Sequence, residues 1–231
     1  MQDTIIILGK QGIANESKTI HAGLYAQDPF TAGRHIAFRD GHGFASGHVV
    51  AEGSFALTNL RHAEVMTLVS GAISLGNTIY KAGEALVLPK GFSGILSCSP
   101  QTCWFYCVMY SGEAGVGHEA IRLDATLPRP ESPGPAQAVL IGHPPQCHAL
   151  NLFTDPTGMR AGVWDVSTPC ERNYVPHKVN ELMHVIEGEM IMTHRNGTSV
   201  VVKAGDAIFV PKEAPYAWKS RVKVVKYYCV M

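Results

Sequence analysis

The sequence predicts an all-β protein in which one β unit occurs twice. Residues 181–211 are rich in Val, Ile, Met and Phe and are interrupted by the turn dipeptide Asn196-Gly197. Residues 64–89 carry the same order of features in a shorter form. In both runs β-branched residues cluster and no apolar period of 3.6 residues persists, so strands joined by tight turns are expected rather than helices.

Identities between the two halves extend the repeat well beyond these runs. They occur in the same order in both halves, and the spacing changes only between the expected strands. A series of this kind predicts an internal duplication. The matched pairs are Phe38 with Phe153, Asp40 with Asp155, Gly43 with Gly158, Gly47 with Gly162, Glu64 with Glu181, Met66 with Met183, Gly71 with Gly188, Gly83 with Gly205, Pro89 with Pro211, and Tyr106-Cys107-Val108-Met109 with Tyr228-Cys229-Val230-Met231.

Few elements are expected outside the repeat, and they are taken here in chain order. Residues 4–8 form a strand candidate, and residues 10–35 have no placement from the sequence. A stretch rich in proline and glycine, including LPRPESPGP, predicts a linker over 113–135 between domains at 1–112 and 136–231. The second domain is expected to begin with the strand candidate AVLIG. Whether each opening strand pairs within its own domain or with the other is left open.

The sequence predicts two specific turns inside the second unit. Asn196-Gly197 suits a type I′ hairpin turn, in which both central residues have positive φ. Gly205-Asp206 predicts a tight turn before a last short strand, Ala207 to Val210.

Composition narrows the function classes. Hydrophobic residues make up 46% of the chain and charged residues 16%, and 19 Lys and Arg balance 19 Asp and Glu. Nucleic-acid binding is therefore not expected, because no basic field is available to hold a phosphate backbone. The chain shows no signal peptide and no apolar run of the roughly 20 residues that a membrane span needs. Six cysteines without a C-x2-C pair predict buried thiols in a reducing compartment, so a cytoplasmic location is expected.

Two short patterns carry a family resemblance. Glu181 is followed by Gly188 with six residues between them, and Gly205-Asp206 is followed by Pro211. These resemble the two sequence motifs of the cupins. The flanking residues resemble the small-cupin subgroup related to the cupin domain of (S)-ureidoglycine aminohydrolase and to the ethanolamine-utilisation cupins. The match is close over about residues 160–231 and weaker over about 45–110.

The resemblance implies a bicupin of the RmlC-like superfamily, with two tandem jelly-roll (double-stranded β-helix) barrels, each open at one mouth. Cupin motifs commonly supply three His and one Glu to a metal inside the barrel. Here His177 and Glu181 occupy two of these positions, and Val175 and Tyr216 occupy the others. The resemblance therefore implies one divalent transition metal, Mn, Fe, Ni or Zn, as a possible cofactor of the second barrel. The first barrel keeps only Glu64, with His62 two residues before it on the same strand face.

Each candidate site residue also has a structural alternative. Glu181 shares strand parity with Met183 and is expected to face inward, where burial would raise its pKa and suit a catalytic base; its alternative is a hydrogen bond to Tyr216. His184 has the opposite parity and is expected on the surface or in a dimer contact. The remaining ligand-binding candidates, each with the core as its alternative, are Met183 and the aromatics Trp164, Tyr174, Tyr216 and Trp218. Arg172 and Lys178 are expected either to steer a carboxylate at the barrel mouth or to lie on the solvated surface. Lys226, in the last strand, is expected either to meet an anionic ligand or to point outward and guard a strand edge.

Two functions are consistent with these residues. The preferred one is a binding protein whose second barrel holds a small polar organic acid or amine. The alternative is a metal-dependent enzyme acting on an amino-acid or ureido-type substrate, with Glu181 and Tyr216 as catalytic groups. The expected partner is a small molecule in either case, and the chain is expected to be a monomer or a homodimer.

Overall fold

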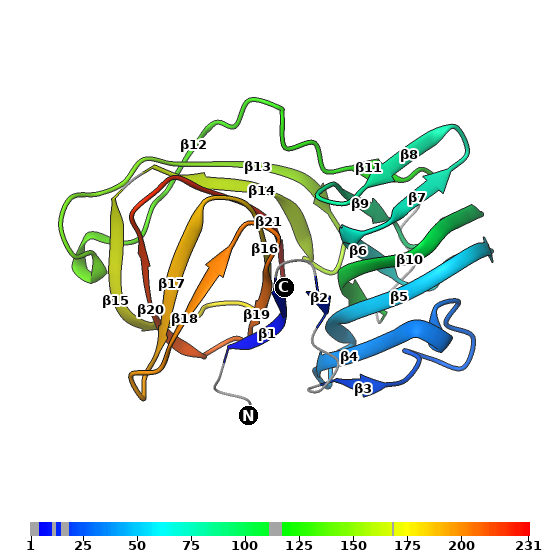
Figure 1. Cartoon of the computed structure of the whole chain (residues 1–231), viewed down its shortest axis with the longest axis horizontal. Coiled ribbons are helices and arrows are strands. Elements are labelled where there is room, and N and C mark those ends of the chain that lie inside the picture. The colour runs from blue at the N-terminus through cyan, green and yellow to red at the C-terminus, as the bar shows by residue number, and fades with distance from the viewer. Residues whose placement is uncertain (1–4, 11–12, 15–18, 111–116, 168) are drawn as a thin grey trace.

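The computed structural model describes residues 5–10, 13–14, 19–110, 117–167 and 169–231 and shows an all-β protein of two lobes lying side by side (Figure 1). Those residues contain no α-helix, only the 3-10 turns Thr31–Gly33 and Gln137–Val139. The strands of the first half are β1 (Ile6–Lys10), β2 (Ile13–Ala14), β3 (Ile20–His21), β4 (Arg34–Arg39), β5 (Phe44–Leu57), β6 (Ala63–Ser70), β7 (Ala72–Leu75), β8 (Thr78–Lys81), β9 (Ala85–Leu88) and β10 (Gly94–Met109). Those of the second half are β11 (Ile121–Arg122), β12 (Glu131–Ser132), β13 (Cys147–Thr154), β14 (Arg160–Val166), β15 (Cys170–Pro176), β16 (Glu181–Glu187), β17 (Glu189–His194), β18 (Ser199–Lys203), β19 (Ala207–Val210), β20 (Pro215–Ser220) and β21 (Val224–Val230).

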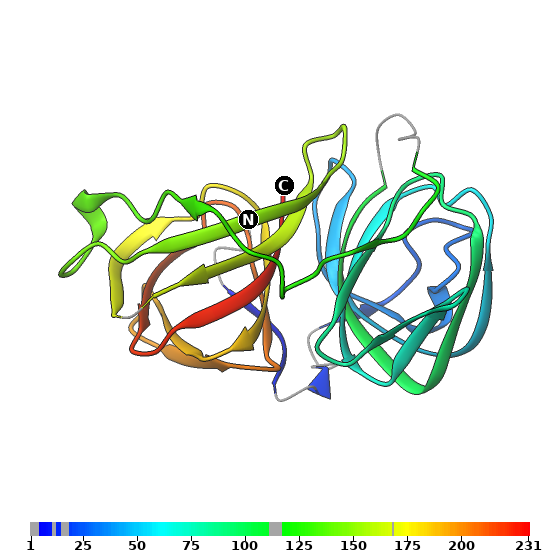
Figure 2. The same ribbon diagram turned by 90° about the horizontal axis from the view of Figure 1, so that it is seen from above.

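Antiparallel pairing gathers these strands into three sheets. The N-terminal lobe is a nine-stranded sheet in the order β11-β9-β6-β10-β5-β4-β3, with β7 and β8 attached through β10. Strand β10 pairs with β7 near its start and with β6 near its end, and the register shifts between Cys98 and Thr102, so this sheet bends around its core. The C-terminal lobe has an eight-stranded sheet, β12-β13-β14-β21-β16-β19-β1-β2, facing a four-stranded sheet, β15-β20-β17-β18 (Figure 2).

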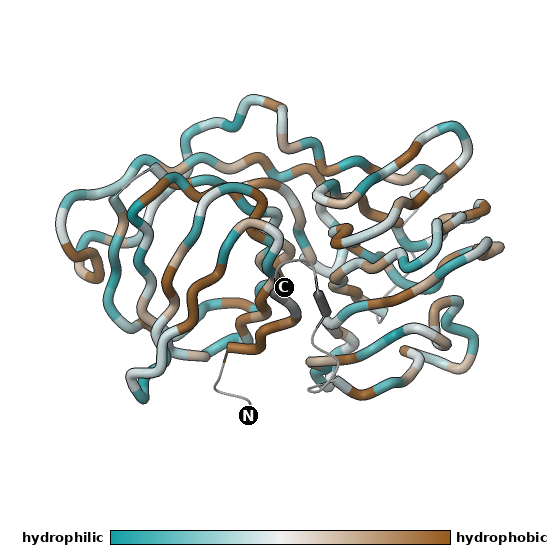
Figure 3. The backbone as a smooth tube through the Cα atoms, viewed as in Figure 1, coloured by the Kyte–Doolittle hydropathy of each residue, from teal (hydrophilic) through white to brown (hydrophobic). Residues whose placement is uncertain are grey.

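Hydrophobic side chains form three clusters. One fills the N-terminal lobe around Trp104 and Tyr106, and one fills the C-terminal lobe around Met183 and Trp218. The third lies between the lobes and joins residues such as Phe105 of β10 to residues such as Phe209 of β19. Hydrophobic and hydrophilic residues alternate along many strands in Figure 3, as expected where the two faces of a strand have different surroundings. Neighbouring residues of a central strand belong to different clusters, as Trp104 and Phe105 of β10 do, so both faces of such a strand are buried.

The two halves exchange their opening strands. Strand β1 pairs with β19 in the C-terminal lobe, with Ile6 opposite Phe209. Strand β11 pairs with β9 in the N-terminal lobe, with Ile121 opposite Val87. Strands β9 and β19 are equivalent in the repeat, so the exchange is reciprocal. The strand candidate at residues 4–8 corresponds to β1 and pairs with the other half, whereas β11 lies in the stretch expected to be a linker and not in AVLIG.

The segment between the repeats differs from the sequence expectation. Residues 121–122 and 131–132 form short strands inside the stretch expected to be a linker. AVLIG is not a strand: Gln137–Val139 is a 3-10 turn, and the first long strand of the second half is β13. The apolar run is too short to override its neighbours, because proline precedes it and Gly142 has a φ of 93° at its end.

Glycines at equivalent positions show the duplication in the backbone. A Cβ on Gly47 would lie 2.0 Å from the carbonyl oxygen of His35, and one on Gly162 would lie 2.0 Å from that of Leu150. The register shifts beside both glycines, in β4–β5 and in β13–β14. Each glycine thus accommodates a bulge in the neighbouring strand.

The second hairpin closes differently from the type I′ prediction. Positive φ occurs at Gly197, at 85°, but not at Asn196. The amide of Gly197 donates to the carbonyl of His194, and the Asn196 side chain accepts from the amide of Thr198. The loop is four residues long, so a single left-handed glycine closes it.

Candidate functional site

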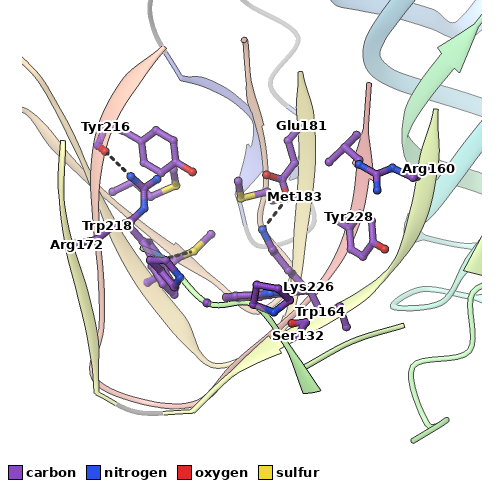
Figure 4. A pocket seen from close by; sticks show the side chains of 17 residues that line it. Ser132, Arg160, Trp164, Arg172, Glu181, Met183, Tyr216, Trp218, Lys226 and Tyr228 are labelled. Carbon is purple, nitrogen blue, oxygen red and sulfur yellow. Dashed lines mark hydrogen bonds and ion pairs between the residues drawn. The ribbon is translucent and has the colours of Figure 1, made fainter. Parts of the chain in front are cut away.

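The C-terminal lobe contains a cavity of about 510 Å³ between its two sheets (Figure 4). Side chains from both sheets line it, and residues 132–135 of the connecting segment close one side. Apolar, aromatic and cationic groups dominate the lining. The lining residues are Ser132, Pro133, Gly134, Pro135, Ala149, Arg160, Trp164, Arg172, Glu181, Met183, Met190, Met192, Tyr216, Trp218, Lys226, Tyr228 and Val230.

Strand register explains why these side chains meet. Across β14, β21 and β16, one row consists of Arg160, Val230 and Glu181. Two residues further along, the next row joins Tyr228 and Met183, and the row after that places Trp164 beside Lys226. Alternate residues of a strand share a face, so all three rows project toward the cavity.

Glu181 is the only carboxylate of the cavity lining, and both of its oxygens are engaged. Lys226 donates to Oε1 at 2.8 Å, and Nε2 of His177 lies 2.9 Å from Oε2 as an ion pair rather than a well-aimed hydrogen bond. Burial raises the pKa of Glu181, but Lys226 and His177 outweigh burial and lower it to about 2. The expectation of a raised pKa is therefore wrong, because the sequence did not place Lys226 against the carboxylate. Glu181 is therefore ionised at neutral pH.

Tyr216 connects the two sides of the site. Its hydroxyl lies 3.2 Å from Nδ1 of His177, so Tyr216, His177 and Glu181 form a continuous polar chain. The guanidinium of Arg172 stacks 4.2 Å from the centre of the Tyr216 ring and donates to the Tyr216 carbonyl at 3.2 Å. Burial, opposed by Arg172, raises the pKa of Tyr216 to about 12. The phenol is neutral at physiological pH and remains a hydrogen-bond donor.

Aromatic residues enclose the inner part of the cavity. Lys226 lies 4.9 Å from the Trp164 ring centre, and the rings of Trp164 and Trp218 are 5.8 Å apart. Trp218 donates from Nε1 to the sulfur of Met190 at 2.9 Å. Lys226 is only 9% exposed, so it does not guard a strand edge.

Two other candidates lie elsewhere. Tyr174 is 43% exposed and does not line the cavity. His184 is 1% exposed and packs against Phe105 of the other lobe, so the surface expectation is wrong. Its strand parity was predicted correctly, but the outward face of β16 is covered by the N-terminal lobe. Burial lowers the pKa of His184 to about 4.

The equivalent region of the N-terminal lobe is filled by its own side chains. Arg34, with a fully buried side chain, donates to Glu64 at 2.8 Å and to Asp28 at 2.6 Å. Trp104 and His62 also contact the Glu64 carboxylate, at 3.0 and 2.8 Å. Burial raises the pKa of Glu64, but Arg34 and His62 outweigh it and lower it to about 2.

Known proteins resemble this chain in sequence and fold to different degrees. A family model described as an EutQ-like cupin domain matches residues 158–228. A crystal structure of a protein of unknown function from Pseudomonas syringae pv. tomato, assigned to the DUF861 family, is 30% identical, covers 99% of both chains and superposes with a TM-score of 0.93. The chain belongs to the DUF861 family of cupins. No functionally curated protein matches the sequence.

More distant cupins share the fold alone. The DUF861 protein Ylba from E. coli is 12% identical over 100% of this chain and 92% of its own, with a TM-score of 0.54. Salicylate 1,2-dioxygenase from Pseudaminobacter salicylatoxidans is 11% identical over 81% of this chain and 70% of its own, with a TM-score of 0.53. In the part of the chain that the structure describes, no helix has the length and apolar character to cross a bilayer.

The cupin metal position does not fit an ion in this chain. Among the described residues, no group of three or more His, Cys, Asp and Glu side chains could hold a metal. Only His177 and Glu181 remain of the motif ligands, and Lys226 occupies the carboxylate oxygen that faces the cavity. A metal would have to displace a bound ammonium group and find its other ligands elsewhere. The Glu181–Lys226 pair takes the place of such a centre.

Sequence reasoning missed one residue of the cavity lining and left another undecided. Arg160 was not a candidate, and for Lys226 a ligand contact and an outward position at a strand edge were both left open. The repeat held a signal for Lys226, since it lies at the position of Trp104, two residues before the matched Tyr106 and Tyr228. A lysine in place of a core tryptophan indicates an inward polar group. The repeat held no such signal for Arg160, because the equivalent residue is an alanine, Ala45, which lies opposite Val108.

Proposed function

We propose that the C-terminal lobe binds a small organic anion, and that the chain is a bicupin whose N-terminal barrel has no open site. The observation that carries this is the charge of the cavity lining, which has three cationic side chains, Arg160, Arg172 and Lys226, and one carboxylate, Glu181. Glu181 is already paired with Lys226. An amine would meet an excess of positive charge, so an organic acid fits better.

The size and lining of the site also support a bound small molecule. A volume of about 510 Å³ lies within the range of ligand pockets, and a mainly apolar lining with a few convergent polar groups is their usual composition. We place the boundaries of the two barrels at residues 1–112 and 136–231, joined by 113–135. Strand β1 of the first barrel pairs with the second, and β11 of the connecting segment pairs with the first.

The binding experiment compares acids with amines of the same carbon skeleton. Thermal unfolding of the full chain is followed with valerate and with pentylamine. Valerate is expected to stabilise the protein, by about 2.7 kcal/mol at a concentration 100 times the Kd, and pentylamine is not. Arg172→Ala is expected to weaken this effect, and Arg195→Ala, on an exposed hairpin, is the matched control. Stabilisation by the amine alone, or by neither compound, would overturn the proposal.

A proton-transfer enzyme is the second candidate, favoured by the Tyr216–His177–Glu181 chain. Tyr216 borders the cavity and its neutral phenol can donate a proton, while the His177 ring beside it provides a route for its replacement. We propose that such activity would act on an acid bound in the same place. Proton NMR in heavy water tests this with 2-oxoglutarate. If Tyr216 protonates the ketone oxygen while a buffer base removes a C3 proton, the C3 protons exchange faster with wild type than with Tyr216→Phe. Equal exchange rates would rule this candidate out.

A further inference from the structure

We infer that the ligand carries two acidic groups, one held by Arg172 and the other by Arg160, with an apolar body between them. This inference rests on the proposed anion-binding function and adds its chemical class, a dicarboxylate with a hydrocarbon spacer. The two arginines belong to different sheets, β14 of the eight-stranded sheet and β15 of the four-stranded sheet. Figure 4 shows them on opposite sides of the cavity.

Neutral groups hold the guanidinium of Arg172 in place. Its Nη1 donates to the backbone carbonyls of Tyr216 and Asn173, at 3.2 and 3.4 Å, and its guanidinium stacks on the Tyr216 ring. Among the described residues, no carboxylate forms an ion pair with it. The side chain is 9% exposed, so its charge is largely removed from water, and it projects into the cavity. A guanidinium held by neutral acceptors retains donors suited to a carboxylate.

Arg160 supplies a second cation at the edge of the site. It is exposed, opens the row that contains Glu181, and forms no hydrogen bond or ion pair within the described part of the chain. The equivalent position in the N-terminal lobe, where Arg34 fills the interior beside Glu64, is Ala45. Arg160 also acts electrostatically on Tyr228 beside it, opposing the rise that burial causes in the pKa of that phenol. The second arginine is thus specific to the lobe with the cavity.

Apart from the Glu181–Lys226 pair, the lining between the arginines is mainly apolar. Lys226 does not bind a third anion because Glu181 already neutralises it at 2.8 Å. The walls between the two guanidinium groups are aromatic rings and thioethers, which favour hydrocarbon over further polar groups. A monocarboxylate would satisfy only one arginine, and a compact anion such as phosphate would not reach both sheets. The apolar side chains in this part are Trp164, Met183, Met190, Met192 and Trp218.

The test uses calorimetric titration with pairs of acids that differ only in the second carboxylate. Glutarate and adipate are compared with valerate and hexanoate, at low and at moderate salt. In wild type we expect the better diacid to bind at least about tenfold more tightly than its monoacid, corresponding to one added ion pair worth about 1.4 kcal/mol. Arg160→Ala is expected to remove this advantage while the monoacid keeps its affinity. Arg172→Ala is expected to weaken both acids, and Arg195→Ala to leave all four affinities unchanged.

The outcomes separate the two proposals. If valerate and hexanoate bind but the diacids gain nothing, or if Arg160→Ala leaves the diacid preference intact, the two-acid inference is wrong and anion binding stands. If none of the acids binds, anion binding itself is wrong. Arg160 is exposed, so its variant is expected to fold; Arg172→Lys, which keeps the charge, is the second variant if Arg172→Ala does not fold.

Discussion

The two lobes place the same glutamate on the same strand and surround it differently. Glu64 and Glu181 occupy equivalent positions, and in each lobe the strand that pairs with theirs sends a donor to Oε1: Trp104 in the first and Lys226 in the second. A His-to-Tyr chain leads away from Oε2 in both lobes. These chains use residues that do not correspond in the repeat, Tyr25 with His62 and Tyr216 with His177.

The decisive difference between the lobes lies on β4 and β13, two strands beyond those that carry the donors. Arg34 pairs with Val49 between β4 and β5, and at the equivalent place Ala149 pairs with Trp164 between β13 and β14. The N-terminal lobe therefore fills its interior with a guanidinium, whereas the C-terminal lobe leaves space there. Duplication preserved the buried carboxylate in both lobes. What changed is whether the protein or a ligand occupies the space beside it.

The largest expected effect contrasts the two carboxylate partners. Arg34→Met leaves Asp28 and Glu64 buried without their shared cation, and we expect it to lower the free energy of unfolding by about 3–5 kcal/mol. Lys226→Met should cost about 1–3 kcal/mol, because Glu181 borders a cavity that admits water. Urea denaturation of both variants measures the difference. Equal losses would contradict the distinction between a filled and an open lobe, and Arg34→Lys serves if Arg34→Met does not fold.

The second prediction concerns the contact between the lobes. Thr67 and His184 are equivalent in the repeat, are both buried, and each has a side-chain atom without a hydrogen-bond partner. Only His184 titrates. Its pKa falls to about 4 in the folded protein because of burial, against about 6.5 unfolded, so the unfolded chain binds the proton first as the pH falls. The resulting stability is fully present above about pH 6.5 and is lost between about pH 6.5 and 4.

Replacing this histidine should flatten the pH profile. His184→Leu is expected to remove roughly 3 kcal/mol of the difference in unfolding free energy between pH 7 and pH 4. Urea denaturation at a series of pH values measures it. Thr67→Ala should leave the pH slope unchanged, and His143→Leu, at an exposed position, is the control for the loss of any histidine. Burial and the neighbouring His35 also lower the pKa of His48 to about 4, so a residual slope is expected from His48. A slope that His184→Leu leaves unchanged would contradict the prediction.

Much of this organisation could be predicted from the sequence, and the reasons for the rest are physical. The repeat places Glu64 and Glu181, the glycines beside the bulges, and the aromatic Tyr106 and Tyr228 because each is fixed by strand register. The sequence does not give the exchange of β1 and β11, since strand pairing over long separations depends on packing between lobes. It also does not give the pKa of Glu181, because Lys226 reaches the carboxylate from another strand, β21, 45 residues away in the sequence.

The smallest predicted effect tests the space beside Ala149 directly. Ala149 lines the cavity at the position that Arg34 takes in the other lobe, and Ala149→Met adds an unbranched, uncharged side chain there. We expect at least about tenfold weaker glutarate binding, equivalent to about 1.4 kcal/mol, with folding retained because the cavity accepts the added volume. Ala149→Ser, which adds little volume, should bind as wild type does. Unchanged binding in Ala149→Met would mean that the ligand lies elsewhere in the lobe, and that the difference between Arg34 and Ala149 concerns packing alone.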